Sequence, residues 1–186
     1  CDEGDCDLHG RQVVRGSGEG LGTAMFRGLK AAVNDDVQVI VSIDGDGQTD
    51  VDGELVSFIT PVLEGTADLV LGSRFLQSGS VRYKYKWKNR IGTQILVGML
   101  RRRTGLLLTD SHGGIRAMTC DVVRDLEMIG THTYVQETII DAHEKGFRIL
   151  ELPSAWLPRA HGKSRVVRSI PRYVLYTLPV LLLRSG

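Results

Sequence analysis

A cluster of closely spaced carboxylate and amide side chains lies in the first third of the chain. Its members are Asp44, Asp46, Gln48, Asp50 and Asp52. The preceding residues 37–43 are mostly apolar and β-branched, which favours a strand buried on both faces of a parallel sheet. Carboxylates this close repel one another, and a hard divalent cation with oxygen ligands relieves that repulsion. The cluster therefore predicts a site for Mg²⁺ or Mn²⁺, with an acidic loop that only caps a helix at Asp50 or Asp52 as the alternative.

The segments that follow this cluster indicate where it lies in the fold. Residues 55–63 have a helical pattern, and residues 68–71 form a second apolar run that ends close to Arg74. Strand, helix and strand in this order are typical of a parallel α/β sheet. Such sheets bind their ligands at the carboxyl edge, so Arg74 is expected at the same edge as Asp44.

Further helices and strands are predicted on either side of these segments. Residues 21–33 and 131–145 have the apolar spacing of helices, and residues 147–152 read as another strand. Gly20 and Gly22 stand at the start of the first helix, where glycines let backbone amides approach a phosphate or a nucleotide. A plain turn at these glycines is the alternative.

Charge is distributed unevenly along the chain, although the net charge is only +1. Residues 1–54 hold twelve acidic and four basic side chains, whereas residues 82–186 hold eighteen basic and eight acidic ones. An acidic end that binds a metal and a basic remainder suit a substrate made of phosphates and a metal. A patchy surface without function is the alternative. The length of 186 residues suits one domain with a substantial core.

Basic and aromatic side chains alternate in residues 81–103, which contain no acid. This pattern suits a membrane surface with anionic headgroups or a nucleic acid, and a solvated helix is a third interpretation. Nucleic acid is not expected as a partner, because the sequence contains no recognisable nucleic-acid-binding module. Residues 170–183 are strongly apolar but shorter than the roughly 20 residues of a membrane span, so they predict an interfacial helix, with a core helix as the alternative.

The cysteines predict neither a disulfide framework nor a metal site. Cys1, Cys6 and Cys120 are odd in number and lack the spacing of metal ligands. This usage favours a reducing compartment, and no signal peptide is visible at the start of the chain.

Four stretches, in this order, resemble motifs of family-2 glycosyltransferases with the GT-A fold. Residues 44–48 resemble that family's Asp-any-Asp metal motif with its downstream Gln, and residues 71–75 resemble its Gly-Ser-Arg-aromatic stretch. Residues 110–116 resemble its Asp-to-Ser-Gly-Phe-Arg loop, with Gly-Gly-Ile in place of Ser-Gly-Phe. Residues 159–165 resemble its Arg-two-Gly-one-Ser-Lys motif, with Arg165 in place of Lys. Within the family, the chain resembles the dolichyl-phosphate and polyprenyl-phosphate sugar transferases.

This resemblance implies an α/β fold of the GT-A nucleotide-sugar-binding type, with a mostly parallel sheet flanked by helices. It implies an inverting, metal-dependent hexosyltransferase that acts at the cytoplasmic face of a membrane. The donor would be a GDP- or UDP-sugar, the acceptor a polyprenyl (dolichyl) phosphate, and the cofactor Mg²⁺ or Mn²⁺.

The resemblance also implies roles for individual residues. The implied metal ligands are Asp44, Asp46 and Gln48. The implied donor-binding residues are Gly20, Gly22, Asp44, Asp46, Arg159, Ser164 and Arg165. The implied acceptor phosphate-binding residues are Arg74, Lys88 and Arg90. The implied catalytic residues are Asp46, Gln136 and Glu137, with Glu137 positioning substrates first and acting as a base second.

The chain departs from the family pattern at its start. The opening strand with its Asp-Asp-Gly-Ser nucleotide segment is missing or shortened into residues 2–7. The expectation is therefore an N-terminally abbreviated GT-A domain over residues 1–169, followed by an apolar tail over residues 170–186 that forms an interfacial helix or begins a membrane segment. A truncated, non-catalytic GT-A domain and a transferase with a hydroxyl acceptor are the alternatives.

Two other metal-binding motifs are disfavoured. A phosphohydrolase of the haloacid-dehalogenase type needs Asp-any-Asp-Gly-Thr, but Gln48 separates Gly47 from Thr49 here. A helix-loop-helix calcium site needs glycine at its sixth position, where counting from Asp44 gives Thr49.

Overall fold

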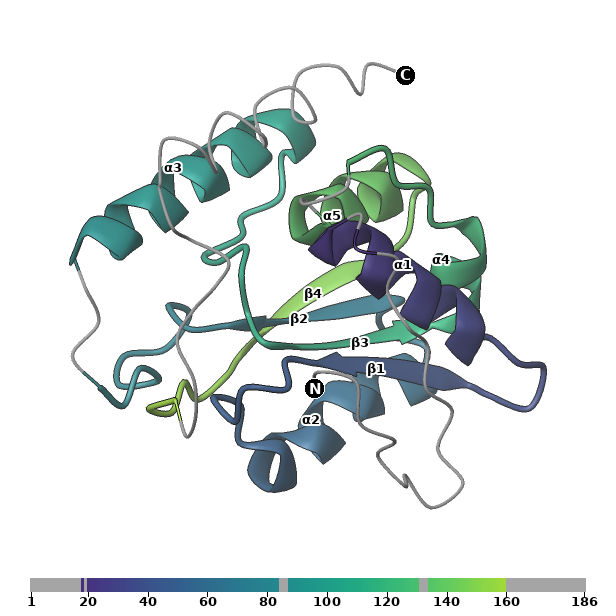
Figure 1. Ribbon diagram of the computed structural model, residues 1–186, viewed down its shortest axis with the longest axis horizontal. Coiled ribbons are helices and arrows are strands. Elements are labelled where there is room, and N and C mark those ends of the chain that lie inside the picture. The colour runs from purple at the N-terminus through teal and green to yellow at the C-terminus, as the bar shows by residue number, and fades with distance from the viewer. Residues whose placement is uncertain (1–17, 19, 84–86, 131–133, 160–186) are drawn as a thin grey trace.

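The computed structural model describes residues 18, 20–83, 87–130 and 134–159. The elements in chain order are α1 (Leu21–Ala32), β1 (Val39–Ile43), α2 (Val51–Leu63), β2 (Leu69–Ser73), α3 (Trp87–Thr104), β3 (Ile115–Thr119), α4 (Cys120–Asp125), α5 (Tyr134–Glu144) and β4 (Ile149–Pro153) (Figure 1). The expected abbreviation of the first strand falls in residues 1–17, which lie outside the described residues. Ser164, Arg165 and the apolar tail of residues 170–186 lie outside them as well.

The four strands form one sheet in the order β1-β3-β2-β4. β3 runs antiparallel to both of its neighbours, whereas β2 and β4 are parallel. β1, β2 and β4 therefore point the same way, and their carboxyl ends share one edge with the start of β3. The α/β fold expected from the sequence is confirmed, with a mixed sheet in which three strands share a direction and β3 reverses it.

β1 is less buried than its sequence predicts. Of its five residues only Ile40 is buried, whereas all five residues of β2 are buried. The prediction of burial on both faces is wrong for β1 because, within the described sheet, this strand is an edge strand that pairs with β3 alone. β2 lies between β3 and β4, which cover its two edges, and its side chains are buried in apolar cores on both faces of the sheet.

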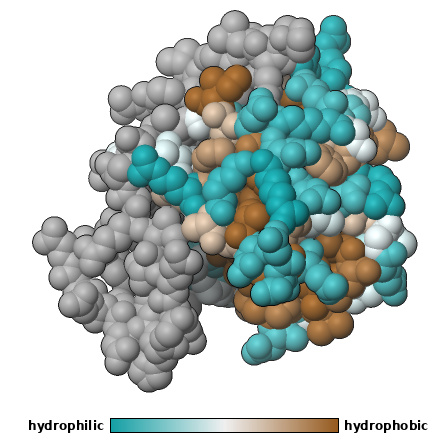
Figure 2. Space-filling view, turned by 90° about the vertical axis from the view of Figure 1, so that its right-hand side faces the viewer, coloured by the Kyte–Doolittle hydropathy of each residue, from teal (hydrophilic) through white to brown (hydrophobic). Residues whose placement is uncertain are grey.

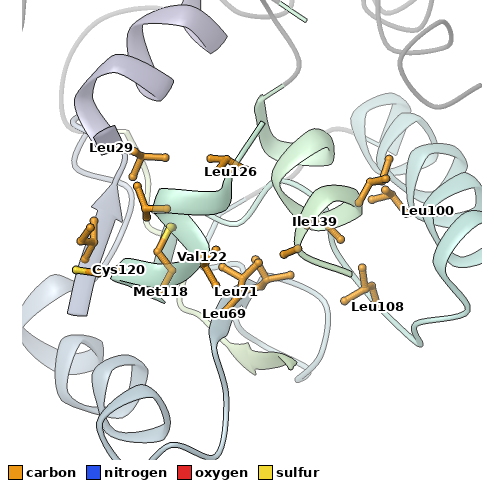
Figure 3. Close-up of a cluster of buried hydrophobic side chains, with 14 of the residues drawn as sticks. Leu29, Leu69, Leu71, Leu100, Leu108, Met118, Cys120, Val122, Leu126 and Ile139 are labelled. Atoms are coloured by element: carbon orange, nitrogen blue, oxygen red, sulfur yellow. The ribbon is translucent and has the colours of Figure 1, made fainter. Parts of the chain in front are cut away.

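Helices cover both faces of the sheet. α2 packs on one face, and α1, α3, α4 and α5 lie on the other (Figure 1). Side chains that alternate along the strands build two separate cores. Leu69, Leu71 and Met118 belong to the larger core (Figure 3), whereas Val70 packs with Phe58 of α2 in the smaller one. The sheet is thus held between two apolar layers, which gives its carboxyl edge a rigid support.

Local sequence signals place most elements within a few residues of their predicted positions. α1, β2, α5 and β4 match the segments predicted from the sequence. α2 begins earlier than predicted because Asp50 is its N-cap, accepting the backbone N–H of Gly53 at 3.2 Å. Helix capping is therefore confirmed for Asp50, but it does not account for Asp44 and Asp46. β3 and α4 were not predicted, because the sequence assigns residues 110–116 to a loop motif and no element to residues 117–125.

The loop before β3 approaches β2 very closely. A Cβ atom on Gly113 would lie 1.7 Å from the carbonyl oxygen of Gly72, and a Cβ atom on Gly114 would lie 2.7 Å from Thr49 Oγ1. Real Cβ atoms do not come this close to other atoms, so only glycine fits at position 113, and a side chain at position 114 would have to displace Thr49 or Trp156. Gly-Gly-Ile in place of the family's Ser-Gly-Phe therefore accompanies a tight contact between this loop and β2.

α3 lies at the margin of the helical layer (Figure 1). Several of its apolar side chains are exposed to solvent. Trp87, Ile91 and Ile95 follow one another at intervals of four residues and are 67%, 46% and 51% exposed. The last turn carries three consecutive arginines. None of the helices that the structure describes combines the length and apolar character that a membrane crossing requires.

The opposite end of the sheet carries ordinary surface ion pairs. Arg124 of α4 pairs with Asp35 and Asp121, and Arg148 pairs with Asp68 at the start of β2. The face seen from that end is a mosaic of hydrophilic and hydrophobic residues (Figure 2). Exposed pairs of this kind contribute little to stability, so they provide control positions for variants at the carboxyl edge.

Candidate active site

Asp44 and Asp46 lie directly after β1, on the loop that leads into α2. The backbone N–H of Asp44 donates to the carbonyl oxygen of Gly114 at 2.9 Å, which ties this loop to the start of β3. Asp46 Oδ1 accepts the backbone N–H of Gln48 at 3.1 Å, so the loop folds around one of its own carboxylates. Both aspartates are partly exposed. The structure thus places the two carboxylates at the carboxyl edge, where the sequence predicts them.

Arg159 reaches the same loop from the segment after β4. Its Nη2 atom is 2.8 Å from Asp46 Oδ2 and 3.1 Å from Gln48 Oε1. The amide nitrogen of the Gln48 side chain donates to the carbonyl oxygen of Leu157 at 3.0 Å. The backbone N–H of Leu157 donates in turn to the carbonyl oxygen of Gln48 at 2.8 Å. Asp46, Gln48 and Arg159, which the sequence predicts at one site, are therefore in direct contact.

Asp44 lies among groups of both charges. Burial raises the pKa of its carboxyl above the ordinary value, and Asp46 raises it further. Arg116 opposes this shift most strongly, and Arg159 and Arg74 also oppose it. Two carboxylates among three guanidinium groups form a centre that a divalent cation and a diphosphate can enter together without a large net charge.

Tyr134 supports Asp44 from the start of α5. Its side chain forms a hydrogen bond to Asp44, and its ring lies 5.1 Å from the guanidinium carbon of Arg116. Burial raises the pKa of the Tyr134 hydroxyl, so the hydroxyl stays protonated at neutral pH and donates to the carboxylate. α5 thereby fixes one side of the acidic loop.

Arg74 forms a buried ion pair with Asp110. Its Nε atom is 2.6 Å from Oδ2 and its Nη2 atom is 2.8 Å from Oδ1, and its backbone N–H donates to Oδ2 at 3.1 Å. The two residues are only 6% and 2% exposed. Although burial acts to raise it, the hydrogen bonds and charge of Arg74 hold the pKa of Asp110 below its ordinary value. Arg74 thus lies inside the protein, whereas the acceptor-binding role predicted from the sequence calls for an accessible cation.

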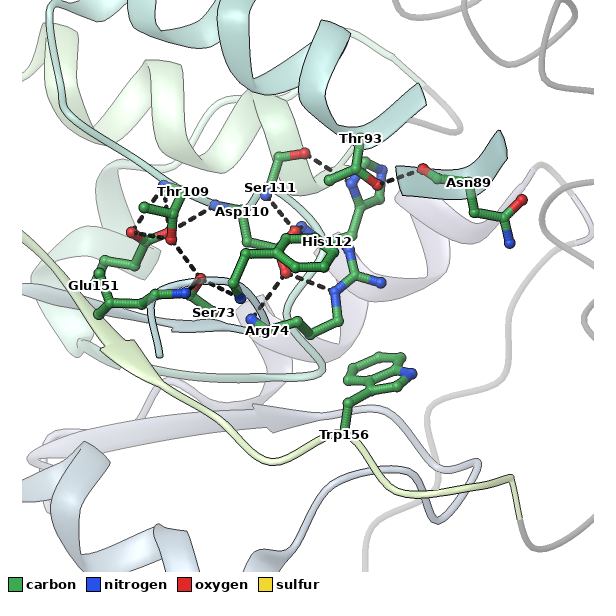
Figure 4. Close-up of polar contacts among 12 residues, drawn as sticks. Ser73, Arg74, Asn89, Thr93, Thr109, Asp110, Ser111, His112, Glu151 and Trp156 are labelled. Carbon is green, nitrogen blue, oxygen red and sulfur yellow. Dashed lines mark hydrogen bonds and ion pairs between the residues drawn. The ribbon is translucent and has the colours of Figure 1, made fainter. Parts of the chain in front are cut away.

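Two aromatic rings lie next to the arginine of this ion pair. The guanidinium carbon of Arg74 lies 4.9 Å from the centre of the Trp156 ring and 5.1 Å from that of Phe75. Trp156 faces Arg74 in Figure 4, and its indole N–H donates to the Tyr83 hydroxyl at 2.8 Å. Arg90, at the start of α3, lies 5.4 Å from the same Phe75 ring. Arg74 and Arg90, which the sequence assigns to one acceptor site, therefore share an aromatic neighbour.

Glu151 of β4 holds the loop that carries Asp110 (Figure 4). Its carboxylate accepts the backbone N–H groups of Thr109 and Asp110 and the Thr109 hydroxyl, with distances of 2.8 Å for Asp110 and for the hydroxyl. Thr109 Oγ1 also lies 2.6 Å from Ser73 Oγ at the end of β2. Burial raises the pKa of Glu151. These contacts fix the position of Asp110 relative to both β2 and β4.

His112 and Gln136 join the loop before β3 to α5. His112 Nε2 lies 3.0 Å from Gln136 Nε2, and its Nδ1 lies 2.7 Å from Ser111 Oγ. Burial lowers the pKa of His112 to about 4, and the charge of Arg74 lowers it as well, so the ring is neutral at pH 7. With the Gln136 amide donating to Nε2, the ring proton lies on Nδ1 and is donated to Ser111. Both ring nitrogens are therefore engaged within the protein.

Glu137 is fully buried and turned toward the loop that precedes α5. Its carboxylate accepts the backbone N–H of Ile129 at 2.7 Å and that of Gly130 at 3.0 Å. A base for a hydroxyl acceptor needs a carboxylate oxygen that reaches the substrate. The geometry therefore favours the positioning role of Glu137 over the role of a base.

The remaining predicted residues lie around this centre or outside the described part of the structure. Gly20 is the N-cap of α1 and has a φ of 127°, a conformation that favours glycine, and Gly22 is buried in the first turn. α1 packs on β1 after a short connection, so it begins near the carboxyl edge. Lys88 lies in the first turn of α3, but its side chain is outside the described residues, as are Ser164 and Arg165.

The side chains at the carboxyl edge can bind a divalent cation whose coordination shell also contains a phosphate-bearing ligand. A guanidinium nitrogen of Arg159 already lies within hydrogen-bond distance of oxygens of Asp46 and Gln48, so these oxygens converge on a positive group. Among the described residues, no group of three or more His, Cys, Asp or Glu side chains forms a complete metal site. Asp44 and Asp46 nevertheless suffice for Mg²⁺ or Mn²⁺ when substrate phosphates and water complete the shell.

Several residues of this site were not predicted individually from the sequence. They are Asp110, Arg116, Tyr134 and Trp156. Arg116 carries a usable signal, because it is a single charge inside an otherwise apolar run that forms a buried strand. Tyr134 and Trp156 have no such signal, since they reach the site only through the packing of α5 and of the segment after β4.

Comparison with protein families identifies one match. The model described as Glycosyl transferase family 2 matches residues 6–127. This region contains the acidic loop after β1, the Arg74–Asp110 ion pair and all of β1, β2 and β3.

Several curated proteins are similar to most of the chain. It is 33% identical over 163 residues to uncharacterized glycosyltransferases of Mycobacterium bovis and Mycobacterium tuberculosis, covering 87% of this chain and 71% of theirs. It is 26% identical over 166 residues to a polyprenol monophosphomannose synthase of Mycolicibacterium smegmatis, covering 87% of this chain and 62% of that protein. It is 31% identical over 159 residues to an undecaprenyl-phosphate mannosyltransferase of Micrococcus luteus, covering 80% and 61%.

Solved structures of glucosyl-3-phosphoglycerate synthase from Mycobacterium tuberculosis have a similar fold. The complex with phosphoglyceric acid has a TM-score of 0.60 at 22% identity, covering 94% of this chain and 58% of that one. The complex with Mn²⁺, UDP and glucosyl-3-phosphoglycerate has a TM-score of 0.60 at 21% identity, with the same coverage. The chain therefore shares their fold and spans less than two thirds of their length.

Proposed function

The chain belongs to glycosyl transferase family 2, and from this premise we propose that it transfers a hexose from a nucleotide sugar to a polyprenyl phosphate at the cytoplasmic face of a membrane. The observation that carries the proposal is the meeting of Asp44, Asp46 and Arg159 at one edge of the sheet, beside a basic and aromatic surface. We assign the catalytic domain to residues 1–169 and an interfacial helix or the start of a membrane segment to residues 170–186.

On the donor side, the diphosphate of a UDP- or GDP-sugar is placed over the loop after β1. Asp44 and Asp46, with the Gln48 oxygen as a third ligand, would hold Mg²⁺ or Mn²⁺, which supplies positive charge to the departing nucleoside diphosphate. Arg159 would bind the diphosphate oxygens, because a guanidinium matches them bidentately. Backbone N–H groups at the start of α1 face the nucleotide. The complex of Mn²⁺ and UDP with an enzyme of the same fold supports this arrangement.

On the acceptor side, a phosphate suits the site better than a hydroxyl. The second pKa of a phosphate monoester is about 6, so its oxygen is ionised at neutral pH and attacks the anomeric carbon without a strong base. The bond to the diphosphate breaks as the new bond forms on the opposite face, which inverts the anomeric carbon. His112, Gln136 and Glu137 are all hydrogen-bonded within the protein. Relatives named for polyprenol and undecaprenyl phosphate support a polyprenyl carrier.

The start of α3 is the proposed binding place of the acceptor phosphate. Arg90 is exposed there, and Lys88 precedes it by two residues in the same helical turn. Arg74 and Arg90 both lie near the Phe75 ring, so the buried Arg74 adds positive potential to this place from inside the protein. Arg90 is accordingly the cation that contacts the acceptor, and Arg74 supports it.

We expect Arg90→Ala to raise the apparent KM for polyprenyl phosphate by about tenfold or more, because a charge-assisted hydrogen bond to the phosphate is lost. The KM for the nucleotide sugar should change by less than about twofold, since Arg90 is not at the donor side. The measurement is transfer of labelled sugar into polyprenyl phosphate in detergent or vesicles. Arg124→Ala provides the control, because it removes an exposed arginine at the opposite end of the sheet, away from α3.

The choice of acceptors in this assay separates the alternatives. Phosphoglyceric acid tests whether any phosphate acceptor is sufficient, and a neutral sugar or a hydroxyl peptide tests the hydroxyl alternative. Efficient transfer to a hydroxyl with no transfer to polyprenyl phosphate would contradict the proposed acceptor. Binding of the nucleotide sugar without transfer to any acceptor would indicate the non-catalytic alternative.

α3 is the proposed contact with the membrane surface. Its exposed apolar residues are Trp87, Ile91 and Ile95, and the arginines of its last turn supply positive charge. An apolar stripe flanked by bases is the composition that binds anionic lipid headgroups. The phosphate end of a polyprenyl acceptor would enter from this surface, next to Arg90.

We expect the protein to sediment with vesicles that contain anionic lipid, and we expect high salt to weaken this binding by screening the arginines. The double variant Ile91→Ser and Ile95→Ser should bind several-fold more weakly, because it removes apolar area from the stripe. Val56→Ser is the matched control, since Val56 is 69% exposed on α2, across the sheet. Binding that ignores lipid charge, salt and the α3 substitutions would exclude α3 as the contact.

A further inference from the structure

Arg159 is held at the point on which two predicted metal ligands converge. A single guanidinium nitrogen, Nη2, lies 2.8 Å from Asp46 Oδ2 and 3.1 Å from Gln48 Oε1. These are oxygens of the kind that Mg²⁺ and Mn²⁺ bind. The positive charge that satisfies them in this structure therefore belongs to the protein itself.

We propose that Arg159 is a built-in counter-ion that competes with the divalent cation for Asp46 and Gln48, and that this competition couples cation binding to donor binding. The proposal rests on the function proposed above, because it concerns the same donor site. It adds that the Arg159 guanidinium weakens the binding of the cation when no nucleoside diphosphate is present.

The competition follows from charge and space. A divalent cation at the Asp46 and Gln48 oxygens cannot share them with Nη2 of Arg159, because like charges at contact distance repel. The guanidinium must therefore leave before or while the cation binds. Once displaced, it needs another anion, and the diphosphate of the donor is bound at the same cation. The cation releases Arg159 to bind the diphosphate, and the diphosphate holds Arg159 away from the cation site. Each ligand therefore makes the binding free energy of the other more favourable, and by the same amount.

The geometry around Arg159 allows this displacement without disturbing the loop. The segment is anchored at Leu157, whose backbone N–H and carbonyl oxygen both bond to Gln48 and do not involve the guanidinium. The Arg159 side chain is 30% exposed, and both contacts described above go through its Nη2 atom. The side chain can therefore move while its backbone stays in place.

The other two arginines near Asp44 are not placed to act in this way. Arg74 is 6% exposed and is held by Asp110 through two parallel contacts. Arg116 is 4% exposed and lies against the Tyr134 ring. Both contribute fixed positive charge, so among the arginines that the structure describes near Asp44, Arg159 is the one whose position can respond to ligands.

Titration of Mn²⁺ with and without UDP or GDP, followed by calorimetry or by electron paramagnetic resonance, tests this proposal without any measurement of activity. The wild type should bind Mn²⁺ weakly alone and clearly more tightly with the nucleoside diphosphate. Arg159→Ala and Arg159→Gln should each bind Mn²⁺ alone about three- to tenfold more tightly than the wild type. The additional gain from the nucleoside diphosphate should shrink, because the displaced guanidinium is no longer there to bind it.

Two control variants test whether the gain in Mn²⁺ affinity comes from losing the contact with Asp46 or only from losing one positive charge. Arg124→Ala removes an arginine that pairs with carboxylates at the opposite end of the sheet. Arg90→Ala removes a charge near the site that lies against Phe75. Both should bind Mn²⁺ alone with an affinity close to that of the wild type. Thermal unfolding of the two Arg159 variants verifies that both remain folded.

The outcomes distinguish this inference from the proposed function. If the wild type binds Mn²⁺ with UDP or GDP but the Arg159 variants bind Mn²⁺ alone no more tightly, the competition is refuted and the proposed donor site stands. An equal gain in the Arg90 variant would also refute it, because contact with Asp46 would then be irrelevant. If the wild type binds Mn²⁺ under neither condition, the proposed function itself fails.

Discussion

Asp46→Ala is expected to lower the rate of sugar transfer by about a thousandfold while the protein remains folded. Asp46 lies on the loop after β1 with a partly exposed side chain, so its removal leaves no cavity in either core. The rate falls because the carboxylate that holds the cation is lost, and the departing nucleoside diphosphate then carries uncompensated charge. Turnover of labelled nucleotide sugar and thermal unfolding of the same preparation measure the two parts of this expectation.

Asp50→Ala is the matched control for this experiment. Asp50 belongs to the same acidic cluster, but its carboxylate caps α2 by accepting the N–H of Gly53. Its loss should reduce the free energy of unfolding by about 1 kcal/mol and leave the rate of transfer within a few-fold of the wild type. Full activity of Asp46→Ala, or full activity of the wild type with excess chelator, would refute the metal site.

Arg74→Ala and Asp110→Ala are each expected to lower the free energy of unfolding by about 3–5 kcal/mol, because each leaves a buried charge without its partner. The pair is almost fully buried, and its two parallel contacts of 2.6 Å and 2.8 Å join the end of β2 to the loop before β3. Urea denaturation followed by circular dichroism measures the change. Arg124→Ala, which breaks an exposed pair, should cost far less.

A double variant tests whether the loss comes from the unpaired charge. Arg74→Met combined with Asp110→Leu removes both charges, and it should be more stable than Asp110→Leu alone. Both variants lose the hydrogen bonds that Asp110 accepts from the backbone N–H groups of residues 74, 111 and 112, but only the single variant keeps an unpaired buried arginine. The free energy of unfolding should also depend on pH. Because folding lowers the pKa of Asp110, the ionised carboxylate stabilises the fold above the ordinary pKa of an aspartate, and this stabilisation is lost as the pH falls through the pKa of the folded state. Single variants as stable as Arg124→Ala would show that the pair is not a structural link.

The buried ion pair with Asp110 changes the interpretation of Arg74. From the sequence, it is an acceptor-binding cation whose loss should raise the KM for lipid phosphate. In the structure, its guanidinium is committed to Asp110, so the first effect of Arg74→Ala is on the fold. Arg90, which is exposed and lies next to Phe75, is the better position for a test of acceptor binding.

The sequence by itself determined the fold class, most elements and the position of the acidic loop. β-branched runs, helical spacing and capping residues are local signals, and they place α1, β2, α5 and β4 close to their observed bounds. Asp44 and Asp46 follow the first apolar run directly, so any fold that uses this run as a strand puts them at its carboxyl end. The order of four motifs then pointed to the family.

Only the tertiary structure decided which charged groups are partnered inside the protein and which face a ligand. Asp110 is thirty-six residues away from Arg74, and Arg159 is more than a hundred residues from Asp46 and Gln48. No local pattern connects such residues, because their contacts depend on how β3 inserts between β1 and β2 and on where the segment after β4 returns. The same packing turns Glu137 toward the backbone of residues 129 and 130 and buries it. A residue's type limits the chemistry it can do, but its burial and its nearest opposite charge decide whether it is free to do it.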